Sequence, residues 1–100
     1  MQIDLGAERL IAAEREDNKI AVEVKSFTAP SAISEFHKAV GQFLNYRRAL
    51  RVLESDRRLY LAVPDRVYKE FFRLRFIQER IEEYKLKLIV YSVEKEGVLQ

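Results

Sequence analysis

The pattern of hydrophobic and polar residues predicts a chain of short strands and helices. Its clearest segment is 19–27, Lys-Ile-Ala-Val-Glu-Val-Lys-Ser-Phe, in which isoleucine and valine recur at every second position. Strand side chains alternate between two faces, so this segment is expected to be a buried β-strand. Alternation elsewhere, and helical spacing of apolar residues, predict strands at 1–5, 10–16, 57–63 and 86–93 and helices at 31–53, 65–73 and 76–84.

The order of these segments predicts the fold class. Strand, helix and strand follow one another at 20–63 and again at 57–93, which favours crossover connections between strands. We therefore expect an α/β (α+β) fold, in which a mixed β-sheet is flanked by helices. One hundred residues suffice for one hydrophobic core, so a single domain over 1–100 is predicted.

Two local features are expected at the ends of these segments. A two-residue turn at 17–18 (Asp-Asn) would form a hairpin in which Ala12 lies opposite Glu23. The long helix is expected to begin at Ser31 as N-cap, with Glu35 near the positive end of the helix dipole.

Composition narrows the classes of site. The chain has no cysteine and one histidine, which excludes disulfides, thiolate zinc sites and histidine-rich sites, so any metal would be bound by oxygen. No apolar run approaches the ~20 residues of a membrane span, and the N-terminus is unlike a signal peptide, so we expect a cytoplasmic protein with no membrane contact.

Charge is distributed unevenly. Residues 1–46 carry five Lys or Arg against seven Asp or Glu, whereas 47–100 carry thirteen against nine. An acidic pocket beside a basic surface suits a metal-dependent enzyme that acts on a polyanion. A solvated surface of mixed charge explains the same counts equally well.

The strongest candidate for chemistry is the pair Glu23 and Lys25. They lie two residues apart, so they share one face of a strand whose neighbours are apolar. An unpaired charge in such a place costs several kcal/mol. We therefore expect these charges to pair with each other or a neighbour, to bind a metal, or to face a water-filled cleft.

A metal site at this strand would need a second carboxylate. Asp4 on a neighbouring strand, Glu23 and the backbone carbonyl of Val24 offer a half-shell for Mg²⁺ or Mn²⁺, whose other ligands would be water and substrate phosphate. Such a metal lowers the pKa of bound water, and Lys25 would orient the attacking water and offset charge on the phosphate. This set of residues suits phosphodiester hydrolysis.

The predicted helix at 31–53 carries a further pair. Gln42 and Tyr46, spaced i and i+4, share one helix face and are candidates to hold a phosphate or a carboxylate ligand. The alternative is an amide and a phenol at the rim of the core. Alternatives also stay open for His37, which is a DNA contact or a surface residue. The arginines near the end of this helix are either phosphate contacts or part of a solvated helix end; they are Arg47, Arg48 and Arg51. The aromatic residues that follow are expected in the core; they are Tyr60, Tyr68, Phe71, Phe72 and Phe76.

The motifs resemble a known group of proteins. Asp4, Glu-Val-Lys at 23–25 and Gln-x-x-x-Tyr at 42–46 resemble the PD-(D/E)XK nuclease superfamily, including its RecB-like branch. The whole chain is similar to the XisH family, cyanobacterial excision controlling factors needed for programmed excision of a DNA element during heterocyst differentiation. The segments that carry this similarity are 4–8, 20–27, 31–37, 41–46, 59–64 and 86–91.

The resemblance implies a restriction-endonuclease-like fold, DNA as a partner, and often a companion XisI-type protein in a homo- or hetero-oligomer. Two departures stand out. Members of the family usually begin with a further helix and strand, which are missing before Met1 here. Ile3 stands where the superfamily has a proline before the aspartate, so Glu8 remains an alternative to Asp4 as the first carboxylate.

Three hypotheses follow for function. The first is a metal-dependent DNA endonuclease, or nuclease-like subunit, with catalytic residues Asp4, Glu23 and Lys25. The second is a non-catalytic adaptor that binds DNA or a partner protein and controls a separate recombinase. The third is one half of a heteromer with an XisI-like chain, which would cover an exposed sheet edge or apolar patch.

Overall fold

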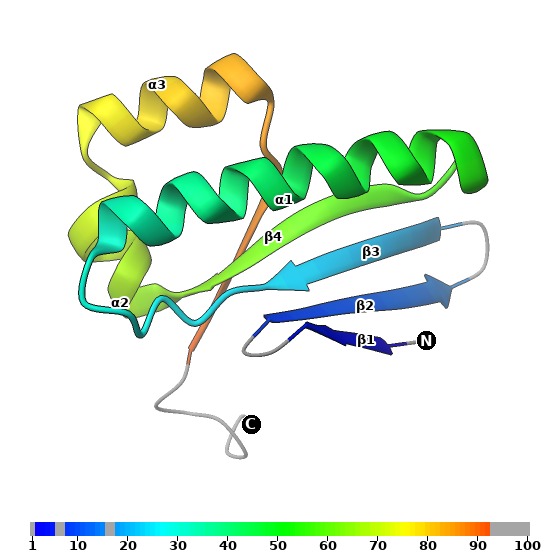
Figure 1. Ribbon diagram of the computed structural model, residues 1–100, viewed down its shortest axis with the longest axis horizontal. Coiled ribbons are helices and arrows are strands. Elements are labelled where there is room, and N and C mark those ends of the chain that lie inside the picture. The colour runs from blue at the N-terminus through cyan, green and yellow to red at the C-terminus, as the bar shows by residue number, and fades with distance from the viewer. Residues whose placement is uncertain (1, 6–7, 16–17, 93–100) are drawn as a thin grey trace.

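The computed structural model describes the backbone of residues 2–5, 8–15 and 18–92 and the side chains of residues 11–14 and 18–92. The elements in chain order are β1 (Gln2–Leu5), β2 (Glu8–Arg15), β3 (Asn18–Val24), α1 (Ala32–Leu53), β4 (Arg58–Pro64), α2 (Asp65–Val67), the π-helix η1 (Tyr68–Phe72), α3 (Arg75–Tyr84) and β5 (Leu88–Tyr91). The strands form one sheet in the order β1-β2-β3-β4-β5, and the helices lie on one face of it (Figure 1).

The sheet is mixed, as the order of the segments predicts. β1, β2 and β3 form an antiparallel meander, whereas β4 pairs with β3 and β5 pairs with β4 in parallel. α1 lies on the crossover from β3 to β4, and the later helices lie on the crossover from β4 to β5. The predicted α+β class is therefore confirmed, and the architecture is consistent with a restriction-endonuclease-like fold.

The register of the first hairpin differs from the predicted one by two residues. Leu10, and not Ala12, lies opposite Glu23, and the last pair is Arg15 opposite Asn18. The prediction that placed Asn18 in the turn is therefore wrong. A shift of two residues keeps every side chain on its original face, so the alternation of residue types cannot distinguish the two registers.

β3 ends at Val24, three residues before the predicted end at Phe27. The backbone nitrogen of Lys25 still donates a hydrogen bond to the carbonyl of Ala62 on β4 (3.0 Å). Phe27 has a φ of 55°, in the left-handed region that aromatic residues rarely adopt. Its ring is buried and packs edge-on against Phe72 at 5.4 Å, so a core contact accompanies the bend that leads the chain to α1.

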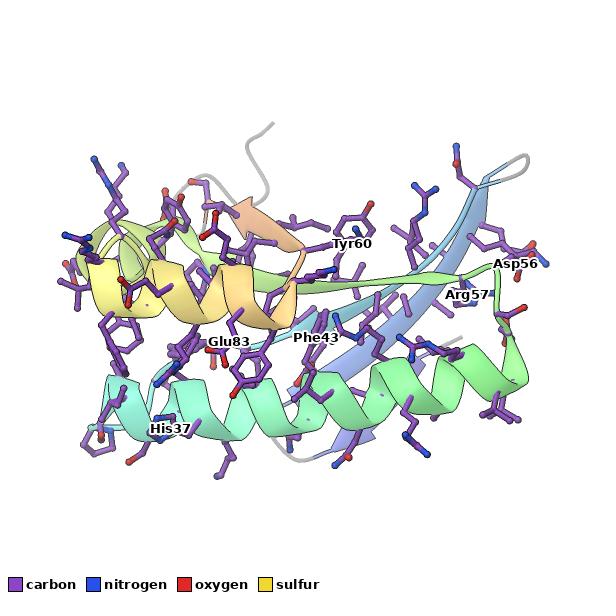
Figure 2. The ribbon with its side chains drawn as sticks, turned by 90° about the horizontal axis from the view of Figure 1, so that it is seen from above. His37, Phe43, Asp56, Arg57, Tyr60 and Glu83 are labelled. Atoms are coloured by element: carbon purple, nitrogen blue, oxygen red, sulfur yellow. The ribbon has the colours of Figure 1, made fainter. Side chains whose placement is uncertain are left out.

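α1 agrees with the prediction at both ends. The backbone nitrogen of Ser34 donates to the side-chain oxygen of Ser31 (3.2 Å), so Ser31 is the N-cap. The face of α1 that carries Phe36, Ala39 and Phe43 is buried against the sheet, and Figure 2 shows Phe43 on the sheet side of the helix.

The helical region between β4 and β5 differs from its prediction. The segment predicted as one helix at 65–73 is a short α-helix, α2, followed by the five-residue π-helix η1. α3 begins at Arg75, one residue before its predicted start, and β5 is shorter than the predicted strand at 86–93. In an α-helix each backbone N–H bonds to the carbonyl four residues earlier, and in a π-helix to the carbonyl five residues earlier. The spacing of apolar residues over five positions does not distinguish the two, so the sequence does not predict the π-helix.

Aromatic residues pack between α1 and the π-helix η1. Phe36 and Phe72 are almost completely buried with ring centroids 5.5 Å apart, and Phe71 packs against both. The prediction that Phe76 belongs to the core is wrong, because its side chain is 46% exposed and its ring lies under the guanidinium of Arg80. No helix or strand in the described part of the chain covers the side of α3 from which the Phe76 side chain projects.

Helices cover one face of the sheet, and no described helix covers the other (Figure 1). In β3, Ala21 and Glu23 are buried on the face that α1 covers, whereas Val22 and Val24 are only half-buried. Figure 2 shows Tyr60 on the side of β4 that faces away from α1. None of the helices in the described ranges has the length and apolar content to cross a membrane.

Candidate active site

Glu23 lies near the C-terminal end of β3, the middle strand of the sheet, and the residue is 0% exposed. Its ladder neighbours are Leu10 on β2 and Leu61 on β4. Removing a carboxylate from water into apolar surroundings costs several kcal/mol unless other groups compensate it. The Glu23 carboxylate therefore needs compensation from a neighbouring charge, a hydrogen-bond donor or a bound cation.

Lys25 follows Glu23 on the same side of the chain and is 3% exposed. Its Nζ atom lies 3.8 Å from Oε1 of Glu35, whose side chain is 17% exposed. The expectation that buried charges at this strand pair is therefore confirmed for Lys25. Glu35 stands in the first turn of α1, so the packing of that helix on the sheet places a carboxylate beside the lysine.

Gln42 and Tyr46 lie on α1, the helix that covers the face of β3 on which Glu23 is buried. The side-chain oxygen of Gln42 is buried and accepts no hydrogen bond from any described residue. Tyr46 is half-buried and packs against the hydrophobic core. A buried amide oxygen without a donor is unusual in folded proteins, and a ligand or a cation would satisfy it.

The two candidates for the first carboxylate lie on the β1–β2 hairpin, and their side chains lie outside the described residues. Asp4 pairs with Arg9, and Arg9 pairs with Val24. One step further along the same register, Glu8 comes opposite Lys25. In the alternation along the strands, the backbone position of Glu8 therefore corresponds to the sheet face of Glu23 and Lys25. The backbone position of Asp4 corresponds to the opposite face, that of Val24. The expectation that Asp4 lies on the strand next to Glu23 is wrong, because β2 lies between β1 and β3. The choice between Glu8 and Asp4 as the first carboxylate stays a prediction.

A divalent cation would be bound by oxygen at this site. Among the described side chains no three His, Cys, Asp or Glu converge as a metal site requires. In the hypothesis of a metal site, the Glu23 carboxylate and the Val24 carbonyl would be joined by a carboxylate from the β1–β2 hairpin. The buried carboxylate of Glu23 and the buried amide oxygen of Gln42 are hard donors, and they fit Mg²⁺ or Mn²⁺.

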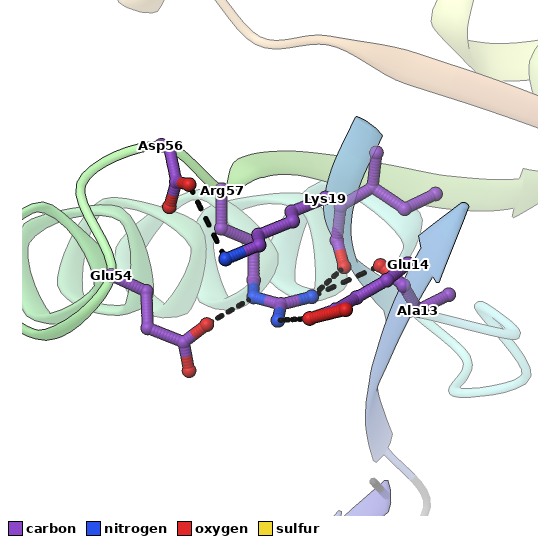
Figure 3. Close-up of polar contacts among 7 residues, drawn as sticks. Ala13, Glu14, Lys19, Glu54, Asp56 and Arg57 are labelled. Carbon is purple, nitrogen blue, oxygen red and sulfur yellow. Dashed lines mark hydrogen bonds and ion pairs between the residues drawn. The ribbon is translucent and has the colours of Figure 1, made fainter. Parts of the chain in front are cut away.

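Arg57 stabilises the opposite end of the strand that carries Glu23. Its guanidinium donates to the carbonyls of Ala13 on β2 (3.0 Å) and Ile20 on β3 (2.8 Å), and its Nε atom lies 2.7 Å from Glu54 (Figure 3). Its side chain is 7% exposed. The sequence shows two consecutive arginines at the start of a strand and gives no sign that the first is buried.

The comparisons with known proteins extend these observations. A family model described as XisH protein matches residues 1–99. The chain belongs to the XisH family. The resemblance identified from its motifs is therefore confirmed at the level of the family. The comparison with curated proteins finds no match.

Two crystal structures are similar to this XisH chain. An XisH family protein from Nostoc punctiforme PCC 73102 is 55% identical, with a TM-score of 0.85. An fdxN element excision controlling factor protein from Anabaena variabilis is 57% identical, also with a TM-score of 0.85. Each match covers 100% of this chain and 80% of the other. The fold described above is therefore shared with these two XisH-type proteins.

Proposed function

We propose that this XisH family protein acts in the excision of a DNA element as a nuclease-like subunit of the PD-(D/E)XK type, and that it hydrolyses phosphodiester bonds with Mg²⁺ or Mn²⁺. The observation that carries the proposal is the fully buried carboxylate of Glu23, two residues before the buried ammonium of Lys25. The relative from Anabaena variabilis is named an excision controlling factor, which supports the link to DNA excision.

The residues of the β3 end have distinct roles in this proposal. Glu23 and the carbonyl of Val24 would hold the cation, which would supply Lewis-acid chemistry at the phosphate and a more acidic bound water. Lys25 orients that water and offsets the negative charge that grows on the phosphate. Glu35, 3.8 Å from Lys25, holds the ammonium in position.

The remaining groups come from α1 and the first hairpin. Gln42 and Tyr46 position the substrate, and the buried amide oxygen of Gln42 supports this role. The backbone register favours Glu8 over Asp4 as the first carboxylate. We therefore expect Glu8→Gln to reduce cleavage more than Asp4→Asn does, and rates of the two variants side by side decide between them.

Nicking of supercoiled plasmid DNA tests the hydrolysis. With Mg²⁺ or Mn²⁺ present, we expect the wild type to nick the plasmid and Glu23→Gln and Lys25→Ala each to lower the rate at least about a hundredfold, because each removes a group that stabilises the transition state. Glu82→Gln changes an exposed acid on α3 and serves as the matched control. A wild type that does not cut, or cutting that survives both substitutions, contradicts the proposal.

A second candidate function is a non-catalytic adaptor that controls a separate recombinase together with an XisI-like protein. The observation that favours it is the sheet face that no described helix covers, where Val22, Tyr60 and Ile89 are only half-buried. Burial also raises the pKa of the Tyr91 phenol at the end of β5, and the charge of Arg66 opposes part of that rise. An adaptor predicts no nicking, with DNA or partner binding that survives Glu23→Gln and Lys25→Ala.

A further inference from the structure

A basic hollow lies at the C-terminal end of α1, between that helix, the start of β4 and the segment that joins α3 to β5. Its volume is about 190 Å³, and the buried ring of Phe43 forms part of its floor. No acidic residue lines it. Six of the chain's 18 Lys and Arg residues line this basic hollow: Arg47, Arg51, Arg57, Arg58, Lys85 and Lys87.

Two of these cations are fixed by the fold. The Arg47 guanidinium donates to the carbonyls of Tyr84 (2.9 Å) and Lys85 (3.2 Å) at the end of α3 and lies over the ring of Phe43. Arg57 is fixed by the carbonyls of β2 and β3 and by Glu54. The guanidinium of Arg47, which pairs with no carboxylate in the described part of the chain, therefore loses little conformational entropy when an anion binds. Arg57 also pairs with Glu14 (3.6 Å), so it shapes the wall of the hollow and its charge is already neutralised.

The other four cations carry charge that the fold does not neutralise. Arg51, Arg58, Lys85 and Lys87 are exposed, and none of them forms an ion pair with a carboxylate in the described part of the chain. Like charges gathered in one hollow repel one another and destabilise the fold by themselves. An anion that binds there removes that repulsion.

We propose that the basic hollow binds the backbone phosphates of double-stranded DNA without reading its sequence. Phosphate is the anion that arginine forks and lysine ammonium groups bind together. No exposed aromatic ring lines the hollow, so bases find no stacking partner there. The proposal rests on DNA as the substrate of the function proposed above, and it adds a second contact that takes no part in hydrolysis.

The hollow lies toward the C-terminal end of α1, and none of its lining residues belongs to the candidate active site. Gln42 and Tyr46 belong to the active-site proposal, whereas Phe43 and Arg47, each one residue later, belong to the hollow. One residue along a helix corresponds to a rotation of about 100°. Because the two sets of residues are separate, DNA binding at the hollow can be measured apart from cleavage.

The test is the salt dependence of DNA binding without a divalent metal. The paired variant Arg51→Ala with Lys87→Ala removes two exposed cations of the hollow, and Lys69→Ala with Arg73→Ala removes two exposed cations elsewhere. The probe is a random-sequence duplex in fluorescence anisotropy, and thermal melting verifies the fold of both variants. We expect the slope of log K against log salt to fall by about 1.8 in magnitude for the hollow variant, about 0.9 for each lost contact, and to change little for the control.

Two outcomes of the DNA titration overturn the inference. Either both paired variants lose the same slope, which indicates general charge attraction, or the hollow variant keeps the wild-type slope. Poly-L-glutamate provides a carboxylate polyanion as a further probe. If the hollow variant loses poly-glutamate binding and keeps DNA binding, the hollow is a site for an acidic protein and the proposal is wrong. Because no metal is present, a failure of plasmid nicking leaves this result unaffected.

Discussion

At the scale of single residues, Arg57 has the clearest structural role. It joins three parts of the chain, because its guanidinium bonds to the backbone of β2 and β3 and to Glu54 beyond the end of α1. Those strands carry the candidate active site at their other end. Hydrogen bonds from a charged, buried donor are stronger than neutral ones, and the carbonyls they satisfy would otherwise lose their partners.

We expect Arg57→Ala to lower the free energy of unfolding by about 2–4 kcal/mol, since it leaves two carbonyls and a carboxylate without their donor. Arg57→Lys keeps the charge but loses the planar fork, and we expect about half of that loss. Urea denaturation measures both, with Arg58→Ala as the control because Arg58 is the exposed neighbour. Equal midpoints for Arg57→Ala and the control would show that Arg57 does not stabilise the hairpin.

The residue pattern predicted part of the candidate site. Alternation along 19–27 placed Glu23 and Lys25 on one face, and both are buried. The partner of Lys25 could not be predicted, because Glu35 is near it only after α1 packs on the sheet. For the same reason the sequence identified Gln42 as a candidate and could not show that its amide oxygen is buried without a donor.

At the scale of elements, local signals explain which predictions succeed. α1 was predicted well because its N-cap and its apolar spacing are contained in neighbouring residues. The hairpin register was not, because it depends on pairing between two strands, and a two-residue shift preserves every face. The π-helix η1 and the exposed ring of Phe76 depend on tertiary packing in the same way.

The N-cap of α1 gives a prediction for the element that carries Glu35 and Gln42. Ser31→Ala removes the acceptor of the Ser34 backbone nitrogen, so we expect a loss of about 1 kcal/mol in the free energy of unfolding. Ser31→Asp keeps an acceptor at the N-terminus and should cost much less. Chemical denaturation with an unchanged m-value tests the pair. No loss in Ser31→Ala would show that the cap contributes nothing, and equal losses in both variants would show that a side-chain acceptor is not what stabilises the helix start.

At the scale of the whole molecule, the chain presents three distinct regions. The candidate active site lies between the sheet and α1, the basic hollow lies at the far end of α1, and the opposite sheet face carries no described helix. The charge counts in the sequence could not decide between a basic binding surface and a surface of mixed charge. The fold favours the first alternative, because it gathers six cations from three separate segments into one hollow.

The central claim is that the buried carboxylate of Glu23 serves to bind a divalent cation. The most direct measurement is Mn²⁺ binding by calorimetry with a duplex present, for the wild type and for Glu23→Gln. We predict one Mn²⁺ per chain in the wild type and an affinity at least about tenfold lower in the variant, since a metal ligand is lost. Equal Mn²⁺ binding by the two proteins, or none by the wild type, would contradict the account.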